Sequence, residues 1–309
     1  MEILLQLFLV AAGFFFLVKG ADWFVDGACS VADRFHIPQL IIGLTIVAMG
    51  TSAPEAAVSL TAAVKGVADI TVGNIVGSNI MNVLIILGLT AVILPLKVAA
   101  STVNVEIPFM ILITALLFLM GMDGVVDSVD GLLLTLFFLV YLGYLCFMAV
   151  RHPEQDPGEP IRQLKLWQAL AALVGGLALV LVGSDLAVDA ATALARIFGL
   201  SERFIGLTIV ALGTSLPELV TSITAARKGS ADIAIGNIVG SNIFNILFVV
   251  GLSSLLIPVP FAAPFLRDTL VALAAALFLL LACQRNHVLS RSAGMLMPGG
   301  YAVYFLFLL

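Results

Sequence analysis

Two glutamates stand inside long apolar stretches of this sequence, each among side chains that carry oxygen. Glu55 lies in the segment GTSAPE at 50–55, and Glu218 lies in the matching segment GTSLPE at 213–218. An ionised carboxylate in membrane hydrocarbon costs roughly 2.5–3.5 kcal/mol even on the more lenient insertion scale. Both glutamates are therefore expected to face a protein-lined or watery cavity.

Hydroxyl and amide side chains accompany each glutamate at the same spacing. Residues three and four positions apart share one face of a helix, so Thr51 and Ser52 are expected to project to the same side as Glu55. On the following helix, Ser78 and Asn82 share a face in the same way. The predicted side-chain ligands are Thr51, Ser52, Glu55, Ser78 and Asn82, and their counterparts Thr214, Ser215, Glu218, Ser241 and Asn245.

A proline directly precedes each glutamate. Proline has no N–H, and its ring presses on the carbonyl four residues earlier. Pro54 and Pro217 are therefore expected to free the carbonyls of Gly50 and Gly213. A membrane helix tolerates such a break where something else satisfies the backbone, and a bound cation can do so.

These groups form a ligand set made only of oxygen, with no His or Cys donor beside it. Hard cations take such ligands: Ca²⁺ binds six to eight oxygens, whereas soft metals prefer thiolate or imidazole. Two glutamates neutralise one divalent ion or two monovalent ions, which is the equivalence that exchange of Ca²⁺ against Na⁺ requires. No nucleophile and base accompany the glutamates, so no catalytic residue is predicted. No resident cofactor is predicted either, because both ions would be cargo.

The stretch that holds the first site is duplicated. Residues 43–95 recur at 206–258 with a constant offset of 163, and 33 of the 53 positions are identical without a gap. Each repeat is predicted to contain five helices, and five crossings oblige the second repeat to enter the membrane from the opposite side. The sequence therefore predicts an inverted repeat, an architecture that opens alternately to each side of a membrane.

Several acidic residues lie outside this set. Asp22 and Asp26 recur at the same offset as Asp185 and Asp189, toward the ends of two predicted helices. The sequence leaves open whether they are interfacial or line an ion path. Glu106 aligns with a threonine in the other repeat, so it is predicted to lie outside the duplicated site.

Composition places these elements in a lipid bilayer. The chain is 61% hydrophobic and 11% charged, which is too little polar surface to cover a water-soluble protein of 309 residues. A transmembrane helix takes about 20 apolar residues. The ten predicted helices lie near 3–27, 40–63, 70–94, 103–121, 129–150, 166–191, 203–226, 233–256, 267–284 and 293–309. The predicted fold is thus all-α, with a first repeat at 1–150, a linker at 151–165 and a second repeat at 166–309.

The basic residues predict the orientation. Loops after the first, third, fifth, seventh and ninth helices hold nine Lys and Arg residues, and loops on the other side hold four. Because Lys and Arg in short loops favour the cytoplasm, both termini are predicted outside and the linker 151–165 inside. The net charge of −5 gives no basis for binding nucleic acid. The chain is expected to function as a monomer.

The paired motifs GTSAPE with GNIVGSNIMN, and GTSLPE with GNIVGSNIFN, resemble the two signature repeats of the cation/Ca²⁺ exchanger superfamily. The match extends over the whole chain and is nearest to the prokaryotic Na⁺/Ca²⁺ exchangers, which places the protein in a plasma (inner) membrane. The resemblance implies ten helices, with the second, third, seventh and eighth forming the ion-binding core. It also implies that the long first and sixth helices slide across this core, and that entry of more than two Na⁺ drives out each Ca²⁺.

The resemblance also implies a role for each ligand. Glu55 and Glu218 would be the central Ca²⁺ ligands, shared in turn with Na⁺. The other implied ligands are Thr51, Thr214 and the carbonyls of Ala48 and Ala211, then Ser52, Ser78, Ser215 and Ser241 for Na⁺, and Asn82 and Asn245 in the middle. Some relatives, including K⁺-dependent exchangers, carry Asp at the position of Asn245, so the neutral amide here argues against a K⁺ site.

Two other functions stay open at this point. A Ca²⁺/H⁺ antiporter of the same superfamily would use the glutamates to carry protons, although the many neutral oxygen ligands favour Na⁺. A passive cation channel is a different class of protein, and the inverted duplication argues against it.

Overall fold

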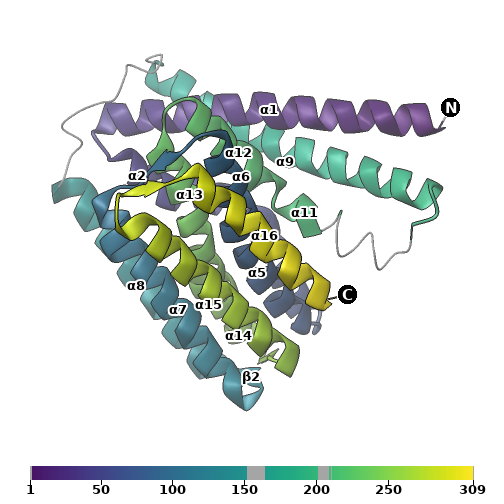
Figure 1. The fold of residues 1–309 in the computed structure, drawn as a ribbon, viewed down its shortest axis with the longest axis vertical. Coiled ribbons are helices and arrows are strands. Elements are labelled where there is room, and N and C mark those ends of the chain that lie inside the picture. The colour runs from purple at the N-terminus through teal and green to yellow at the C-terminus, as the bar shows by residue number, and fades with distance from the viewer. Residues whose placement is uncertain (1, 152–163, 201–208, 210, 309) are drawn as a thin grey trace.

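The computed structural model describes residues 2–151, 164–200, 209 and 211–308, and it is built almost entirely of helices (Figure 1). Most of the predicted linker, at 152–163, and the start of the predicted helix 203–226 lie outside the described residues. The first half contains α1 (Glu2–Phe35), α2 (Gln39–Ile42), η1 (Gly43–Val47), α3 (Ala48–Thr51), α4 (Ala53–Val64), α5 (Asp69–Met81), η2 (Asn82–Leu87), α6 (Gly88–Ile93), β1 (Leu96–Lys97), η3 (Thr102–Glu106), α7 (Ile107–Met120), η4 (Gly121–Asp123), β2 (Val125–Val126) and α8 (Ser128–Arg151).

The second half repeats this order of elements. It contains α9 (Leu166–Ile197), α11 (Ala211–Thr214), α12 (Leu216–Arg227), α13 (Ala231–Phe244), η6 (Asn245–Val250), α14 (Gly251–Leu256), β3 (Val259–Pro260), α15 (Ala263–Gln284), β4 (Val288–Leu289) and α16 (Arg291–Leu308). The two-residue strands pair across the halves, β1 with β4 and β2 with β3, both antiparallel.

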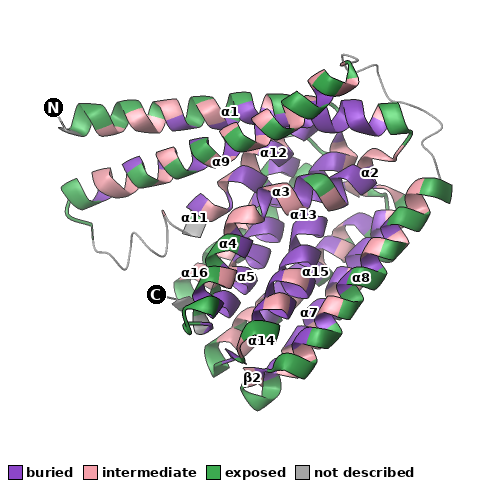
Figure 2. Cartoon of the chain, turned by 180° about the vertical axis from the view of Figure 1, so that it is seen from behind, coloured by how far each residue is buried: buried purple, intermediate pink, exposed green. Residues whose placement is uncertain are grey.

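Seven helices in the described residues are long and apolar enough to cross a membrane. An eighth candidate span is a bent pair, Gln39–Thr51 with Ala53–Val64, whose two parts meet at 51°. Two of the spans form the centre of the molecule, because 78% of the residues in the apolar window of Ile70–Ile93 and 94% of those in Ala231–Leu256 are buried (Figure 2). The chain is therefore an all-helical, multi-pass membrane protein.

The backbone itself is duplicated at the offset found in the sequence. Helix α4 maps onto α12, and the π-helical turn η2 maps onto η6, residue for residue. Every residue of positive φ in the described chain also has a counterpart of positive φ at this offset: His36 with Gly199, Gly66 with Gly229, and Gly124 with His287. The same turns therefore close the same elements in both halves.

Helices α1 and α9 are longer than predicted and form an antiparallel pair at one side of the bundle (Figure 1). The sequence predicts helix ends near 27 and 191, before the charged residues that follow, whereas the helices continue to Phe35 and Ile197. Helix α1 ends where His36 adopts φ 55° and donates its N–H to the carbonyl of Asp33. At 1.5 Å per residue its 34 residues span about 51 Å.

Glycines let the backbones of α1 and α9 touch. A Cβ on Gly20 would lie 2.7 Å from the backbone nitrogen of Val180, and a Cβ on Gly27 would lie 2.6 Å from that of Leu173. On the other helix, a Cβ on Gly183 would lie 2.6 Å from the backbone nitrogen of Leu17. Backbone atoms cannot move aside as a flexible side chain can, so the two helices behave as one unit.

We expect Gly176→Ala to destabilise this unit and Gly175→Ala to leave it intact. A Cβ at Gly176 would lie 2.7 Å from the carbonyl oxygen of Gly20, whereas a Cβ at Gly175 meets nothing within 4 Å. Overpacking costs about 1–3 kcal/mol, while Ala in place of Gly favours a helix by up to about 1 kcal/mol. Thermal unfolding of the two variants in detergent checks this, and equal midpoints would contradict the close packing.

Candidate functional site

A break in the helical backbone positions each glutamate. Helix α3 ends at Thr51, Ser52 has φ −83° and ψ 8°, and α4 then begins with Pro54 and Glu55 in its first turn. The second half repeats this break at Ser215, with Pro217 and Glu218 in the first turn of α12. Proline is favourable at the start of a helix, and the helix dipole stabilises an acidic side chain there.

Both glutamates are completely buried, and each is held by a serine from another segment. Ser78 on α5 donates to Oε1 of Glu55 at 3.3 Å, and Ser52 donates to Oε1 of Glu218 at 2.9 Å. The two carboxylates lie within electrostatic range of each other. Ser52 thus belongs to the first half of the chain but binds the glutamate of the second half.

Several oxygen atoms at this place have no hydrogen-bond partner in the protein. The second carboxylate oxygens, Oε2 of Glu55 and of Glu218, are buried without a donor, as are the amide oxygens of Asn82 and Asn245 and the hydroxyl of Ser215. A buried acceptor left without a partner costs about 1–3 kcal/mol, and more when it is charged. Five such atoms, two of which belong to the carboxylates themselves, fit a bound cation, which would satisfy them together.

Four hydrogen bonds between asparagines join the two central spans. Asn79 donates its Nδ2 to the carbonyl of Asn242, and Asn242 donates its Nδ2 to the carbonyl of Asn79, both at 3.2 Å. Their side-chain oxygens accept from Asn245 at 3.1 Å and from Asn82 at 3.0 Å, respectively. Because the amide nitrogens of Asn82 and Asn245 donate in these hydrogen bonds, their Oδ1 atoms remain available to bind a cation.

Further oxygens gather around the carbonyl of Ala48. This carbonyl accepts from Thr51 Oγ1 at 3.3 Å and from Ser241 Oγ at 3.4 Å. Thr51 Oγ1 also lies 2.9 Å from Oδ1 of Asn237, to which it donates. Thr51 and the carbonyl of Ala48 therefore lie together with Ser241 of the second repeat. Thr214 and Ala211 lie in α11, the short helix before Ser215.

The spacing predicted that Thr51 and Ser52 share the face of Glu55, and in the structure their hydroxyls donate to Asn237 and to Glu218. Because proline has no N–H, the carbonyls of Gly50 and Gly213 lose their helical partners as predicted. The protein supplies substitutes: Ser184 on α9 donates to the carbonyl of Gly213 at 2.9 Å, and the carbonyl of Gly50 accepts from the backbone where α3 ends.

Sequence reasoning also missed the amide supports behind the ligands. Asn74 donates to Ser59 at 3.0 Å, and Asn237 donates to Ser222 at the same distance. The same two amides reach the backbone carbonyls of the glutamates, at 3.2 Å for Glu55 and 3.4 Å for Glu218. A signal was present, since Ser59, Asn74 and Asn79 recur unchanged as Ser222, Asn237 and Asn242.

Glu106 lies outside this arrangement, in agreement with its lack of an acidic counterpart. It is buried at the end of η3, and its Oε1 accepts from the hydroxyl of Tyr144 on α8 at 3.0 Å. Among the described residues, no three His, Cys, Asp or Glu side chains come together as a metal site. A cation bound at the centre would therefore depend on neutral oxygens as well as on the two carboxylates.

A family model described as "Sodium/calcium exchanger protein" matches the chain twice, at residues 5–147 and 168–309. The putative antiporter CaxA of Alkalimonas amylolytica is 45% identical over 91% of this chain and 91% of its own length. The inner membrane protein YrbG of Escherichia coli strain K12 is 38% identical over 97% of this chain and 96% of its own.

Two further comparisons carry the name of an exchanger. The sodium/calcium exchanger MaX1 of Methanosarcina acetivorans is 30% identical over 94% of this chain and 95% of its own length. The solved structure of the sodium-calcium exchanger NCX_Mj superposes with a TM-score of 0.87 at 31% identity, and covers 99% of this chain and 100% of its own. The similarity thus extends over both halves and includes the fold.

Proposed function

This chain belongs to the sodium/calcium exchanger protein family, and on that premise we propose that it exchanges Na⁺ for Ca²⁺ across the membrane by alternating access. Family membership confirms the resemblance seen in the sequence. It also confirms a transporter rather than an enzyme, since the named relatives are exchangers and antiporters. The counter-ion, the charge moved per cycle and the role of each ligand belong to the proposal.

The observation that supports this exchange best is the set of unpartnered oxygens around Glu55 and Glu218. Both Oε2 atoms, the amide oxygens of Asn82 and Asn245 and the hydroxyl of Ser215 are buried without a donor. A divalent ion held between the carboxylates would neutralise both charges. Several Na⁺ ions would need additional clusters of oxygen atoms. Ala48, Thr51 and Ser241 offer one such cluster.

We assign the ligands accordingly. Glu55 and Glu218 bind Ca²⁺ and share Na⁺ in turn, with the amides of Asn82 and Asn245 between them. Thr51, Ser52, Ser78 and their counterparts Thr214, Ser215 and Ser241, with the carbonyls of Ala48 and Ala211, complete the Na⁺ sites. More than two Na⁺ per Ca²⁺ would make the exchange electrogenic. No resident cofactor takes part, because both ions are cargo.

The architecture proposed for this activity is a pair of inverted five-helix repeats, at 1–150 and 166–309, joined by the linker 151–165. The antiparallel pairing of α1 with α9, which are equivalent in the two repeats, supports this inversion. The proposal includes ten transmembrane helices, both termini outside, a cytoplasmic linker and a monomer in a prokaryotic inner membrane. The neutral side chain of Asn245 supports K⁺ independence.

The test is uptake of ⁴⁵Ca²⁺ by proteoliposomes loaded with Na⁺, compared with vesicles loaded with K⁺ or choline. We expect uptake to need internal Na⁺, to respond to membrane voltage and to be unchanged when K⁺ is removed. A Na⁺ gradient does work on Ca²⁺ only if the two fluxes are coupled, so the Na⁺-loaded vesicles should accumulate Ca²⁺ above the external level.

Two outcomes would overturn the assignment. Uptake that a pH gradient drives without Na⁺ would make the protein a Ca²⁺/H⁺ antiporter with Glu55 and Glu218 as proton carriers. Ca²⁺ flux that needs no counter-ion and does not saturate would indicate a passive channel.

A further inference from the structure

The two halves share a sequence pattern but are packed differently. Helix α1 lies along α12 of the other half. The counterpart of α1 is α9 and the counterpart of α12 is α4, yet α9 and α4 make almost no contact within the described chain. Because the two halves carry the same motifs, each half could also pack against its neighbours as the other half does here. An exchange of surroundings between the halves would give a second, related arrangement of the α1/α9 pair on the remaining helices.

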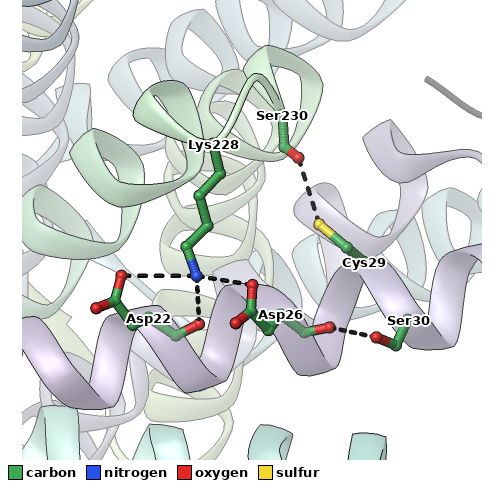
Figure 3. A network of polar contacts seen from close by, with 6 residues as sticks. All are labelled: Asp22, Asp26, Cys29, Ser30, Lys228 and Ser230. Carbon is green, nitrogen blue, oxygen red and sulfur yellow. Dashed lines mark hydrogen bonds and ion pairs between the residues drawn. The ribbon is translucent and has the colours of Figure 1, made fainter. Parts of the chain in front are cut away.

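A single lysine fastens the pair to the remaining helices at one end. Lys228, directly after α12, donates to Oδ1 of Asp26 at 2.7 Å and to the backbone carbonyl of Asp22 at 2.8 Å (Figure 3). The Asp22 carboxylate lies 3.6 Å from the same ammonium group. Beside it, Cys29 of α1 contacts Ser230 at 3.3 Å. All three side chains of the Lys228 cluster are partly shielded from solvent.

The same three residue types are present in the opposite half, and there they are apart. At the offset of 163, the counterparts of Asp22, Asp26 and Lys228 are Asp185, Asp189 and Lys65, respectively. All three of these counterparts are exposed, and the side chain of Lys65 makes no hydrogen bond or ion pair within the described residues. Within the described residues, neither Asp185 nor Asp189 forms an ion pair with a lysine or arginine.

A hollow lies next to Lys65 where the other half is filled. Its volume is about 440 Å³, and its lining includes Ala57, Val58, Lys65 and Val67. Val58 and Val67 are 44% and 45% exposed. In the other half, the counterpart of Ala57 is Val220, which packs against Leu17 and Ala21 of α1. The counterpart of Val67 is Ser230, which contacts Cys29 of α1.

Beside the Lys228 cluster, the α1/α9 pair contacts the other helices through apolar side chains of the main core, such as Phe24 and Val25, and through the hydrogen bond from Ser184 to the carbonyl of Gly213. Leu17, Ala21, Val180 and Ala187 form a small apolar cluster of their own, apart from the main core, and Leu216 and Val220 of α12 pack against it. Small aliphatic side chains resist displacement along a helix less than a hydrogen-bonded lysine does. The charged contact at Lys228 therefore helps to fix the position of the pair.

We propose that Lys228 and Lys65 are alternating positioning residues of the transport cycle. Lys228 holds Asp22 and Asp26 of α1 in the arrangement described here. In the alternative arrangement α9 fills the hollow along α4, and Lys65 binds Asp185 and Asp189. This mechanism rests on the proposed alternating access, but its test does not depend on which counter-ion is used.

The test measures the distance between spin labels at Val64 on α4 and Val182 on α9 by double electron–electron resonance on the full-length protein. Both positions are exposed, and replacing the exposed Cys146 with Ser leaves only buried native cysteines. We expect Lys228→Gln to increase the short-distance population by about tenfold and Lys65→Gln to decrease it by a similar factor, because hydrogen bonds to charged groups are among the stronger ones. Lys228→Arg should restore the original distribution.

Lys97→Gln serves as the matched control, since Lys97 is an exposed lysine in β1 outside both clusters. If Lys65→Gln gives the same distribution as this control, Lys65 is an ordinary solvated lysine and the proposal fails. It also fails if Lys228→Gln lowers the unfolding temperature without changing the distances, because the ion pair is then merely structural. Loss of Na⁺ dependence in the uptake assay would leave these distance results unaffected.

Discussion

Glu55→Gln and Glu218→Gln are each expected to abolish Ca²⁺ uptake by proteoliposomes while leaving the protein folded in the membrane. Glutamine keeps the size of the side chain but removes one of the two charges that would neutralise Ca²⁺. Removing one partner of a buried charge pair costs about 3–5 kcal/mol, so uptake should fall by two or more orders of magnitude. Initial rates of ⁴⁵Ca²⁺ uptake at matched protein density measure this loss.

Glu106→Gln is the matched control for these variants. Glu106 is also a buried glutamate, but it contacts Tyr144 and lies outside the duplicated site. Its replacement should leave uptake within a few-fold of the wild-type rate. Near-normal uptake by either Glu55→Gln or Glu218→Gln would refute the assigned ion site.

The burial of the two glutamates at the centre of the protein could be predicted because chemistry and duplication agree. A carboxylate within an apolar run has few structural uses, and both Glu55 and Glu218 occur at equivalent positions. Both glutamates are buried inside the protein, as predicted, and their second carboxylate oxygens have no hydrogen-bond partner. The continuous apolar runs likewise predicted most helices, because a membrane requires helices of a definite length.

The connections between ligands could not be predicted, because helical spacing describes one segment at a time. The contact between Ser52 and Glu218 joins residues 166 positions apart. It depends on the bend at Ser52 and on how the halves pack. Helix ends were also missed: α1 continues through Asp33 and Arg34, whose charges lie near the helix end and do not interrupt it.

Asparagines near the predicted ligands have a structural role that their residue type does not reveal. Asn79 lies three positions before the predicted ligand Asn82, and both recur in the second half. The structure assigns Asn79 and Asn242 to hold the other amides. Residues that orient a ligand are therefore as strongly duplicated as the ligands themselves.

Asn242→Ala is expected to impair both stability and transport. The change removes the hydrogen bond to the carbonyl of Asn79 and leaves Nδ2 of Asn82 without its acceptor. Each unsatisfied buried group costs about 1–3 kcal/mol, so the free energy of unfolding should fall by roughly 2–5 kcal/mol. Asn82 would then be free to rotate, and its Oδ1 would no longer be held toward Glu55 and Glu218. Ca²⁺ uptake should therefore fall by more than about tenfold.

The symmetric variant Asn79→Ala and the double variant separate support from simple packing. Asn79 and Asn242 bind each other's backbone, so the two losses should not add, and the double variant should be less destabilised than their sum. Asn104→Ala is the control, because Asn104 is exposed on η3. Thermal unfolding and uptake measured on all four variants decide the matter. If the two losses add and uptake stays normal, the asparagines only fill space, and the amide oxygens of Asn82 and Asn245 need no such support to bind the ion.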